Sequence, residues 1–135
     1  MKRILFLIAL ALCFSHHGLA AQTLVAAPVG TTHQVNVSWT NTCPSSMTCT
    51  FNVYQCAGAV SACSLTAAVW QLVNASPIVG TSYSTSAVTA GSTYSYFVNA
   101  LATIGGVAET SPPSNEVAVT VPLGPTAPTV TAMGQ

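Results

Sequence analysis

The chain has 135 residues, of which 50% are hydrophobic and only 3% are charged, and its formal net charge is zero. Lys2 and Arg3 are the only basic residues, and Glu109 and Glu116 are the only acidic ones. A nucleic-acid-binding protein needs many Lys and Arg side chains to neutralise phosphates. A hydrolase with a Ser-His-Asp triad needs an Asp, which the chain lacks entirely. The composition therefore excludes nucleic acid as a partner and argues against the common hydrolase mechanisms.

The first twenty residues have the pattern of a secretory signal peptide. Two basic residues precede the apolar run Ile4–Phe14, and the small residues Gly18 and Ala20 stand at the −3 and −1 positions of a cleavage site. A transmembrane helix needs roughly 20 apolar residues, so this run is too short to be one. A lipoprotein signal built on Cys13 is the weaker alternative, because Leu12 stands where a small residue is expected. We expect export to the extracellular space, the cell surface or the periplasm, with no membrane span after cleavage.

Seven short segments of the remaining chain are predicted to be strands. Alternation of apolar and polar residues is strict in four of them and weaker in three. The strong segments are residues 33–40, 50–56, 93–100 and 116–121, and the weaker ones are 23–28, 69–73 and 82–87. Gly, Pro, Ser and Asn separate the segments, and no stretch has helical periodicity. This pattern is typical of a single antiparallel β-sandwich domain, which we place at residues 21–122, before a flexible Pro-rich tail at 123–135.

Four of these segments resemble strands of a fibronectin type III domain. The motifs are Val35–Trp39, Phe51–Tyr54, Val88–Ala100 and Ser114–Pro122, in the order and spacing of strands B, C, E–F and G. The resemblance covers most of residues 24–122 and implies a seven-stranded, immunoglobulin-like β-sandwich.

The resemblance also implies roles for three structural residues. Trp39 corresponds to the core tryptophan of strand B. Val88 and Tyr94 correspond to a tyrosine corner, in which the phenol oxygen bonds to nearby backbone. The chain departs from the family in one respect, because family members usually lack disulfides and this chain is rich in cysteine.

Four cysteines remain after removal of the signal segment: Cys43, Cys49, Cys56 and Cys63. An even number in an exported chain indicates disulfides. Cys49 and Cys56 stand at opposite ends of a predicted strand, about 23 Å apart at ~3.3 Å per residue, whereas a disulfide needs Cα atoms about 4.4–6.8 Å apart. Only the pairing Cys43–Cys49 with Cys56–Cys63 is local at both ends of that strand. The spacing fits no zinc-ribbon pattern, and we expect neither a metal nor a cofactor.

Other candidates for chemistry are few. His33 begins a predicted strand with no Asp or Cys beside it, so we interpret it as a solvated residue. Glu109 and Glu116 flank a predicted loop through Pro112–Pro113, and two carboxylates so placed are the parts of a glycosidase pair. The simpler interpretation makes Glu116 the start of the last strand and Glu109 a solubilising charge at the loop tip. With no Gly-x-Ser-x-Gly motif either, we expect no catalytic residue and no enzyme.

Aromatic residues are the candidates for ligand contact. Trp70, Tyr54 and Tyr83 are the aromatic residues of interest, because exposed aromatic rings beside Asn and Gln stack on sugars, and Trp70-Gln71 with Asn74 suits such contact. The alternative is that Trp70 packs over the loop between Cys56 and Cys63. We retain Trp70 and Tyr54 as weak candidates for ligand contact.

The scarcity of charge is the last informative feature. Edge strands are usually protected by Lys or other charges, and the predicted sandwich has almost none, so its edges are open to strand addition. We expect a secreted, non-catalytic module for interaction or adhesion with an extracellular protein or a glycan. One alternative is a structural subunit of a filament or surface layer that self-associates through edge strands. A second is a small carbohydrate-binding domain.

Overall fold

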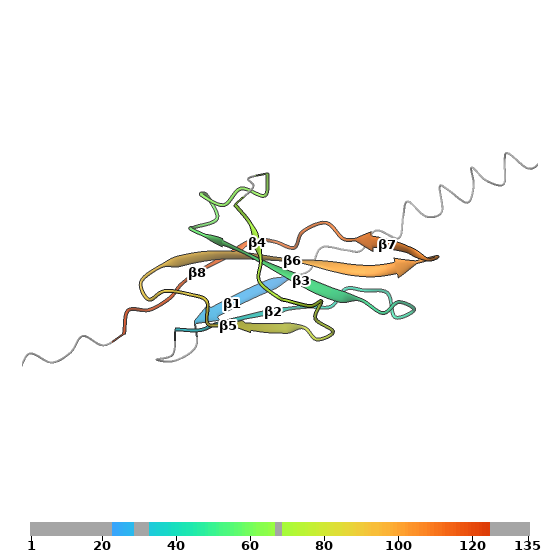
Figure 1. The fold of residues 1–135 in the computed structure, drawn as a ribbon, viewed down its shortest axis with the longest axis horizontal. Helices are drawn as coiled ribbons and strands as arrows, with labels where there is room; N and C mark the ends of the chain where they lie inside the picture. Colours follow the sequence, from blue (N-terminus) through green and yellow to red (C-terminus); the bar gives the residue numbers. More distant parts are fainter. Residues whose placement is uncertain (1–22, 29–32, 67–68, 125–135) are drawn as a thin grey trace, which may run out of the picture.

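The computed structural model describes residues 23–28, 33–66 and 69–124, and every regular element in them is a β-strand (Figure 1). The strands are β1 (Leu24–Pro28), β2 (Val35–Trp39), β3 (Thr50–Ala57), β4 (Gln71–Leu72), β5 (Ser82–Thr85), β6 (Thr93–Ile104), β7 (Val107–Thr110) and β8 (Val117–Thr120). The predicted signal peptide and residues 125–135 of the predicted tail lie outside the described residues. No helix in the described part of the chain is long and apolar enough to cross a membrane.

The strands form two antiparallel sheets. The smaller sheet has the order β1-β2-β5, and the larger has the order β4-β3-β6-β7, with β8 also paired to β6. The longest ladder joins β3 to β6, from Thr50 opposite Leu101 to Ala57 opposite Tyr94. The prediction of an all-β, antiparallel sandwich is therefore confirmed.

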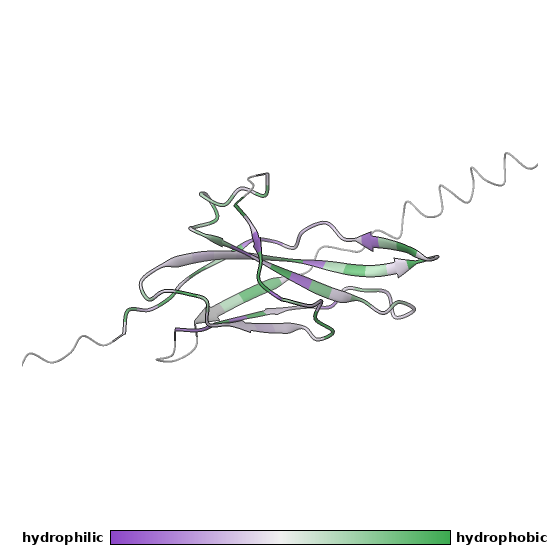
Figure 2. Ribbon diagram, viewed as in Figure 1, coloured by the Kyte–Doolittle hydropathy of each residue, from purple (hydrophilic) through white to green (hydrophobic). Residues whose placement is uncertain are grey.

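The core lies between the two sheets and follows from the alternation of the strands. In β2 the apolar residues Val35, Val37 and Trp39 are buried, while the intervening Asn36 and Ser38 are exposed. Figure 2 shows the same alternation of hydrophobic and hydrophilic residues along β3. A residue pattern with a period of two therefore places one face of each long strand against the opposite sheet.

The C-terminal half of β6 differs from the prediction. A strand was expected only as far as residue 100, but β6 continues to Ile104 and returns as β7. Gly105 and Gly106 form the turn with φ angles of 59° and 85°, a conformation that suits glycine and the twist of a two-residue hairpin. Glu109 therefore lies in a strand, and its predicted place at a loop tip was wrong. Four residues were too few to show alternation.

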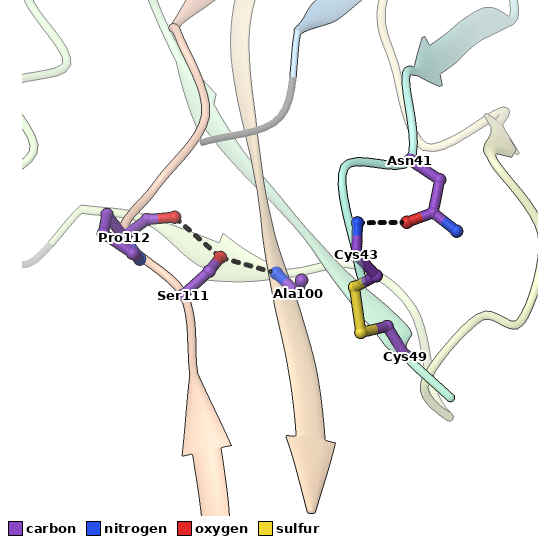
Figure 3. Close-up of a disulfide and its surroundings, with 6 residues drawn as sticks. All are labelled: Asn41, Cys43, Cys49, Ala100, Ser111 and Pro112. Atoms are coloured by element: carbon purple, nitrogen blue, oxygen red, sulfur yellow. Dashed lines mark hydrogen bonds between the residues drawn. A yellow bond between two sulfur atoms is a disulfide. The ribbon is translucent and has the colours of Figure 1, made fainter. Parts of the chain in front are cut away.

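A two-proline interruption separates β7 from β8 along the same edge of β6. Pro112–Pro113 has no N–H groups to donate to a ladder. Ser111 and Ser114 replace the missing backbone pairs. The N–H of Ser111 donates to the carbonyl of Ala100 at 2.8 Å and its Oγ accepts from the Ala100 N–H at 2.9 Å (Figure 3). Ser114 makes the equivalent pair with Val98, at 2.9 Å for each bond.

The weaker predicted strands are shorter in the structure. The strand expected over 69–73 is reduced to the two residues of β4, and the one expected over 82–87 ends at Thr85. Between them the chain crosses from the larger sheet to the smaller one, which it joins through a bond from the Trp39 N–H to the Thr81 carbonyl at 3.0 Å. At the other end of the larger sheet, β7 pairs with β6 alone among the described strands, so it is an edge strand, and its side chains are all exposed.

Candidate functional site

Three aromatic rings form a cluster on the outer face of the larger sheet. Tyr54 on β3 and Phe97 on β6 are register partners, and their rings stack with centroids 4.7 Å apart and planes 13° apart. Trp70 meets Phe97 edge-on at 4.7 Å. Phe97 is consequently only 8% exposed although it points away from the core. The cluster brings together both predicted contact residues, Tyr54 and Trp70, with one that the sequence analysis did not single out.

Trp70 is also tied to the loop that the second disulfide closes. Its indole N–H donates to the carbonyl of Ser64 at 3.1 Å, and the Cys56–Cys63 bridge lies just before that residue, with Cα atoms 6.0 Å apart. Trp70 therefore packs against the disulfide-closed loop, as the alternative interpretation of its role predicts. Its indole N–H is engaged in a hydrogen bond within the chain.

Apolar side chains are exposed along the same segment. They are 39–51% exposed and belong to Val60, Leu65, Val69 and Leu72. The segment from the end of β3 to β4 therefore carries four of the eight large apolar side chains that are exposed in the described residues. We call it the disulfide loop.

Asn74 has a structural role and does not face a ligand. It is 3% exposed, and its Oδ1 accepts from the Val53 N–H at 2.7 Å. Its Nδ2 donates to the carbonyls of Phe51 and Ser76 and to Oδ1 of Asn52, at 3.3, 3.0 and 3.2 Å. The amide fastens the chain after β4 to β3, so the expectation that Asn74 assists Trp70 in sugar contact was wrong. The sequence around Asn74 contains no pattern that predicts the burial of its side chain.

Tyr83 is likewise engaged inside the fold. Its hydroxyl donates to the carbonyl of Val73 at 2.6 Å, and its ring packs against the core. The bond joins β5 of the smaller sheet to the strand connection that leaves the larger one.

The residues assigned to the core and the tyrosine corner occupy such positions. Trp39 is 5% exposed and meets Phe51 at a centroid distance of 5.4 Å. Val88 packs against the core, and the Tyr94 hydroxyl oxygen accepts from the Thr89 N–H at 3.0 Å. The side chain of Thr89, followed by this N–H, lowers the pKa of Tyr94 from its ordinary value of 10.0.

The first disulfide closes the connection from β2 to β3. Cys43 and Cys49 have Cα atoms 6.4 Å apart, and the Cys43 N–H donates to Oδ1 of Asn41 at 2.9 Å (Figure 3). Both bridges in the structure are the pairs that strand geometry selects. Within the described residues, no group of three or more His, Cys, Asp or Glu side chains is placed to hold a metal ion.

The ionisable candidates lie on separate segments. His33 is exposed just before β2. Glu109 is exposed on β7, whereas Glu116 is half-buried immediately before β8, and its Oε2 has no hydrogen-bond partner. Glu109 thus places a negative charge directly on a free strand edge.

Comparison with known proteins identifies the fold. Among the solved structures that match is a crystal structure of an Fn3-like protein from Clostridium thermocellum, with a TM-score of 0.56 and 20% identity over 78% of this chain and 95% of that one. A human FNIII domain in solution, described as the fourth of its protein, matches with a TM-score of 0.53 and 14% identity over 81% of this chain and 85% of that one. The fold is fibronectin type III-like.

Other comparisons add no closer assignment for this fibronectin type III-like domain. A structure described as a myokine matches with a TM-score of 0.55 and 16% identity, over 76% of this chain and 97% of that one. No family model matches the chain, and no curated protein matches it. At these sequence identities, the similarity to the solved structures shows the fold alone.

Proposed function

We propose that the protein is an exported, non-catalytic binding module that contacts another extracellular protein or a glycan through its exposed loops and strand edges. One observation carries the proposal: β7 is a fully exposed edge strand whose only charged residue is Glu109. The fibronectin type III-like fold supports a modular role and does not by itself fix a partner.

Export is supported by two independent features. The N-terminal residues have the basic, apolar and small-residue pattern of a signal peptide. Two disulfides in the described residues suit an oxidising compartment, because cytosolic thiols are kept reduced.

The non-catalytic part of the proposal is supported by the inventory of groups. The chain has no Asp, and its two carboxylates belong to an exposed strand and to the residue before β8. Hydrolysis of a glycan that is lost in Glu109→Ala or Glu116→Ala, while the fold is retained, would overturn it.

Binding is tested with the exported, oxidised protein immobilised on a sensor and exposed to extracellular and cell-envelope fractions of its source. We expect saturable binding that the free protein competes away and that heat-unfolded protein does not. If no binding is competed away by the free protein, the proposal that the protein is a binding module is wrong.

A structural subunit is the second candidate, favoured by the same open edge. Light scattering after size-exclusion chromatography, over a concentration series, separates the two. A monomer at every concentration supports the binding module. Growth into large species at low and high salt alike supports edge-paired assembly, because there is little charge for salt to screen.

A carbohydrate-binding domain is the third candidate, and the ring cluster favours it. Trp70 and Tyr54 are each half-buried, so part of each ring faces solvent. This candidate requires tryptophan fluorescence to change with a soluble polysaccharide and Trp70→Ala to abolish binding. Tyr83→Phe, which alters a ring engaged inside the fold, is the control.

A further inference from the structure

The β6–β7 hairpin extends beyond the rest of its sheet. The last β3 residue paired with β6 is Thr50, opposite Leu101, whereas the pairing of β6 with β7 runs from Leu101 to Ile104. Figure 1 shows the hairpin projecting at one end of the molecule. Among the described strands, β7 pairs with β6 alone, so its outer edge carries no strand.

Strand alternation decides which backbone groups of β7 face outward. The Ser111 N–H donates to the Ala100 carbonyl, so these two residues are a hydrogen-bonded pair. Pairs in an antiparallel ladder alternate between hydrogen-bonded and non-hydrogen-bonded. Glu109 and Val107 therefore direct their backbone groups toward β6, and Ala108 and Thr110 direct their N–H and C=O groups outward. An incoming strand would pair with Ala108 and Thr110.

A second copy of the chain is a poor partner for this edge in the register that pairs both outward-facing residues of each copy. Symmetric antiparallel pairing that places Ala108 of one copy opposite Thr110 of the other sets the two Glu109 residues directly opposite each other, with Cα atoms about 4.5 Å apart. Like charges so placed are destabilising. The only Lys and Arg of the chain are residues 2 and 3, in the predicted signal peptide, so β7 itself carries no basic residue to pair with Glu109.

We propose that the outer edge of β7 binds an extended segment of another protein that carries Lys or Arg opposite Glu109. The backbone of Ala108 and Thr110 supplies the pairing, and the charge of Glu109 selects the partner and disfavours self-pairing. The inference rests on the proposed function, because it names the kind of partner that such a module takes.

The test uses two synthetic peptides that differ in one charge. They are acetyl-Thr-Val-Thr-Lys-Thr-Val-Thr-amide and its counterpart with Glu in place of Lys. NMR titration of the oxidised protein is expected to show shifts centred on the amides of Ala108 and Thr110. We expect the Lys peptide to bind roughly three- to tenfold more tightly, because the attraction to Lys and the repulsion of Glu each contribute up to about fivefold.

Charge variants assign this preference to one residue. Glu109→Gln should remove the difference between the peptides, and Glu109→Lys should reverse it. Glu116→Gln, the matched control at the other carboxylate, should leave it unchanged. Comparable amide spectra for all variants establish that each is folded.

Several outcomes overturn the inference. In the titration, these are no binding of either peptide, equal affinities for the two peptides, or amide shifts centred outside β7. The inference also fails if the preference for the Lys peptide survives Glu109→Gln, or if the wild-type protein is a dimer with protected β7 amides. If the peptides fail while competed binding to extracellular material persists in Glu109→Lys, only this inference fails. If no competed binding occurs at all, the proposed function fails.

Discussion

At the scale of single residues, the buried side chain of Asn74 makes four hydrogen bonds, of which three hold the chain after β4 against β3 and one reaches Ser76. Asn74→Ala removes the acceptor of the Val53 N–H and leaves that buried donor without a partner. We expect a loss of about 2–3 kcal/mol in the free energy of unfolding, since an unsatisfied buried group costs roughly 1–3 kcal/mol. Urea denaturation measures it. The exposed Asn36→Ala should change stability by less than about 0.5 kcal/mol, and an equal loss in both variants would contradict the assignment.

Tyr96 carries a buried hydroxyl group with no hydrogen-bond partner. Burial, followed by the charges of Tyr94 and Tyr83, raises the pKa of Tyr96 far above its ordinary value of 10.0. Above pH 10 the unfolded chain loses this proton while the folded protein keeps it, so stability falls as pH rises. Tyr96→Phe should stabilise the protein by about 1 kcal/mol at pH 7 and weaken the alkaline loss.

Tyr94, which is close to Tyr96 in the chain, serves as the control because its pKa shifts in the opposite direction. Its pKa is lowered in the folded protein, so its ionisation favours the fold as pH rises, and Tyr94→Phe removes both that effect and the bond from Thr89. We expect Tyr94→Phe to destabilise the protein by about 1 kcal/mol. Urea unfolding at pH 7 and pH 11 distinguishes the two tyrosines, and parallel behaviour would contradict the argument.

At the scale of elements, the divided β7–β8 edge depends on two serine hydroxyls. Ser111→Ala and Ser114→Ala each remove the acceptor of a buried β6 N–H, that of Ala100 or Val98. Each variant should lose about 1–3 kcal/mol of stability. Ser82→Ala, on the exposed side of β5, should be near neutral, and hydrogen exchange should speed up at Ala100 and Val98 alone. Unchanged exchange there would show that the hydroxyls are dispensable.

The disulfide loop is the second element with a clear expectation. Replacing Cys56 and Cys63 together by Ala should cost about 2 kcal/mol, the loop-entropy value for a bridge spanning seven residues. Freeing the loop also loosens the Trp70–Ser64 bond, so the emission of Trp70 should shift toward that of water-exposed indole. Trp39→Phe isolates this signal from the core tryptophan. An unshifted emission would mean that Phe97 alone holds Trp70 in place.

The sequence predicts well those elements that carry long alternation. Val35, Val37 and Trp39 show their strand directly, and the two bridges follow from the length of β3. Contacts between distant segments left no such signal. Phe97 falls on the outward face of its strand by alternation, and only the fold reveals that Tyr54 and Trp70 cover it. The burial of Asn74 likewise depends on a chain crossing between sheets.

Glu109 was misplaced for a local reason. Only five residues lie between Gly106 and Pro112, and these are too few to show a period of two. A Gly-Gly pair that follows a long alternating strand is itself a hairpin signal. Had the Gly105–Gly106 pair been interpreted as a hairpin turn, Glu109 would have been predicted to lie in the returning strand.

At the scale of the whole molecule, solubility depends on very few charges. Residues 21–135 contain two Glu and no Lys or Arg, and proteins with a net charge near zero tend to associate. The double variant Glu109→Gln with Glu116→Gln should have a lower solubility limit at pH 7 than Glu116→Gln alone. Turbidity against concentration measures this. Equal limits would show that Ser, Thr, Asn and Gln suffice to keep the surface hydrated.

The link between β1 and the segment before β8 has a mechanical consequence. Asn115 accepts from the Leu24 N–H at 2.8 Å and donates to the Leu24 carbonyl at 3.2 Å, which joins the first strand to the last. In Figure 1, β1 begins near the middle of the long axis, and the chain after β8 leads toward the left end. Tension between residues 23 and 124 would therefore act along the strands and shear the sheets. The two hydrogen bonds between Asn115 and Leu24 would then bear the force together with their neighbours, instead of breaking one after another.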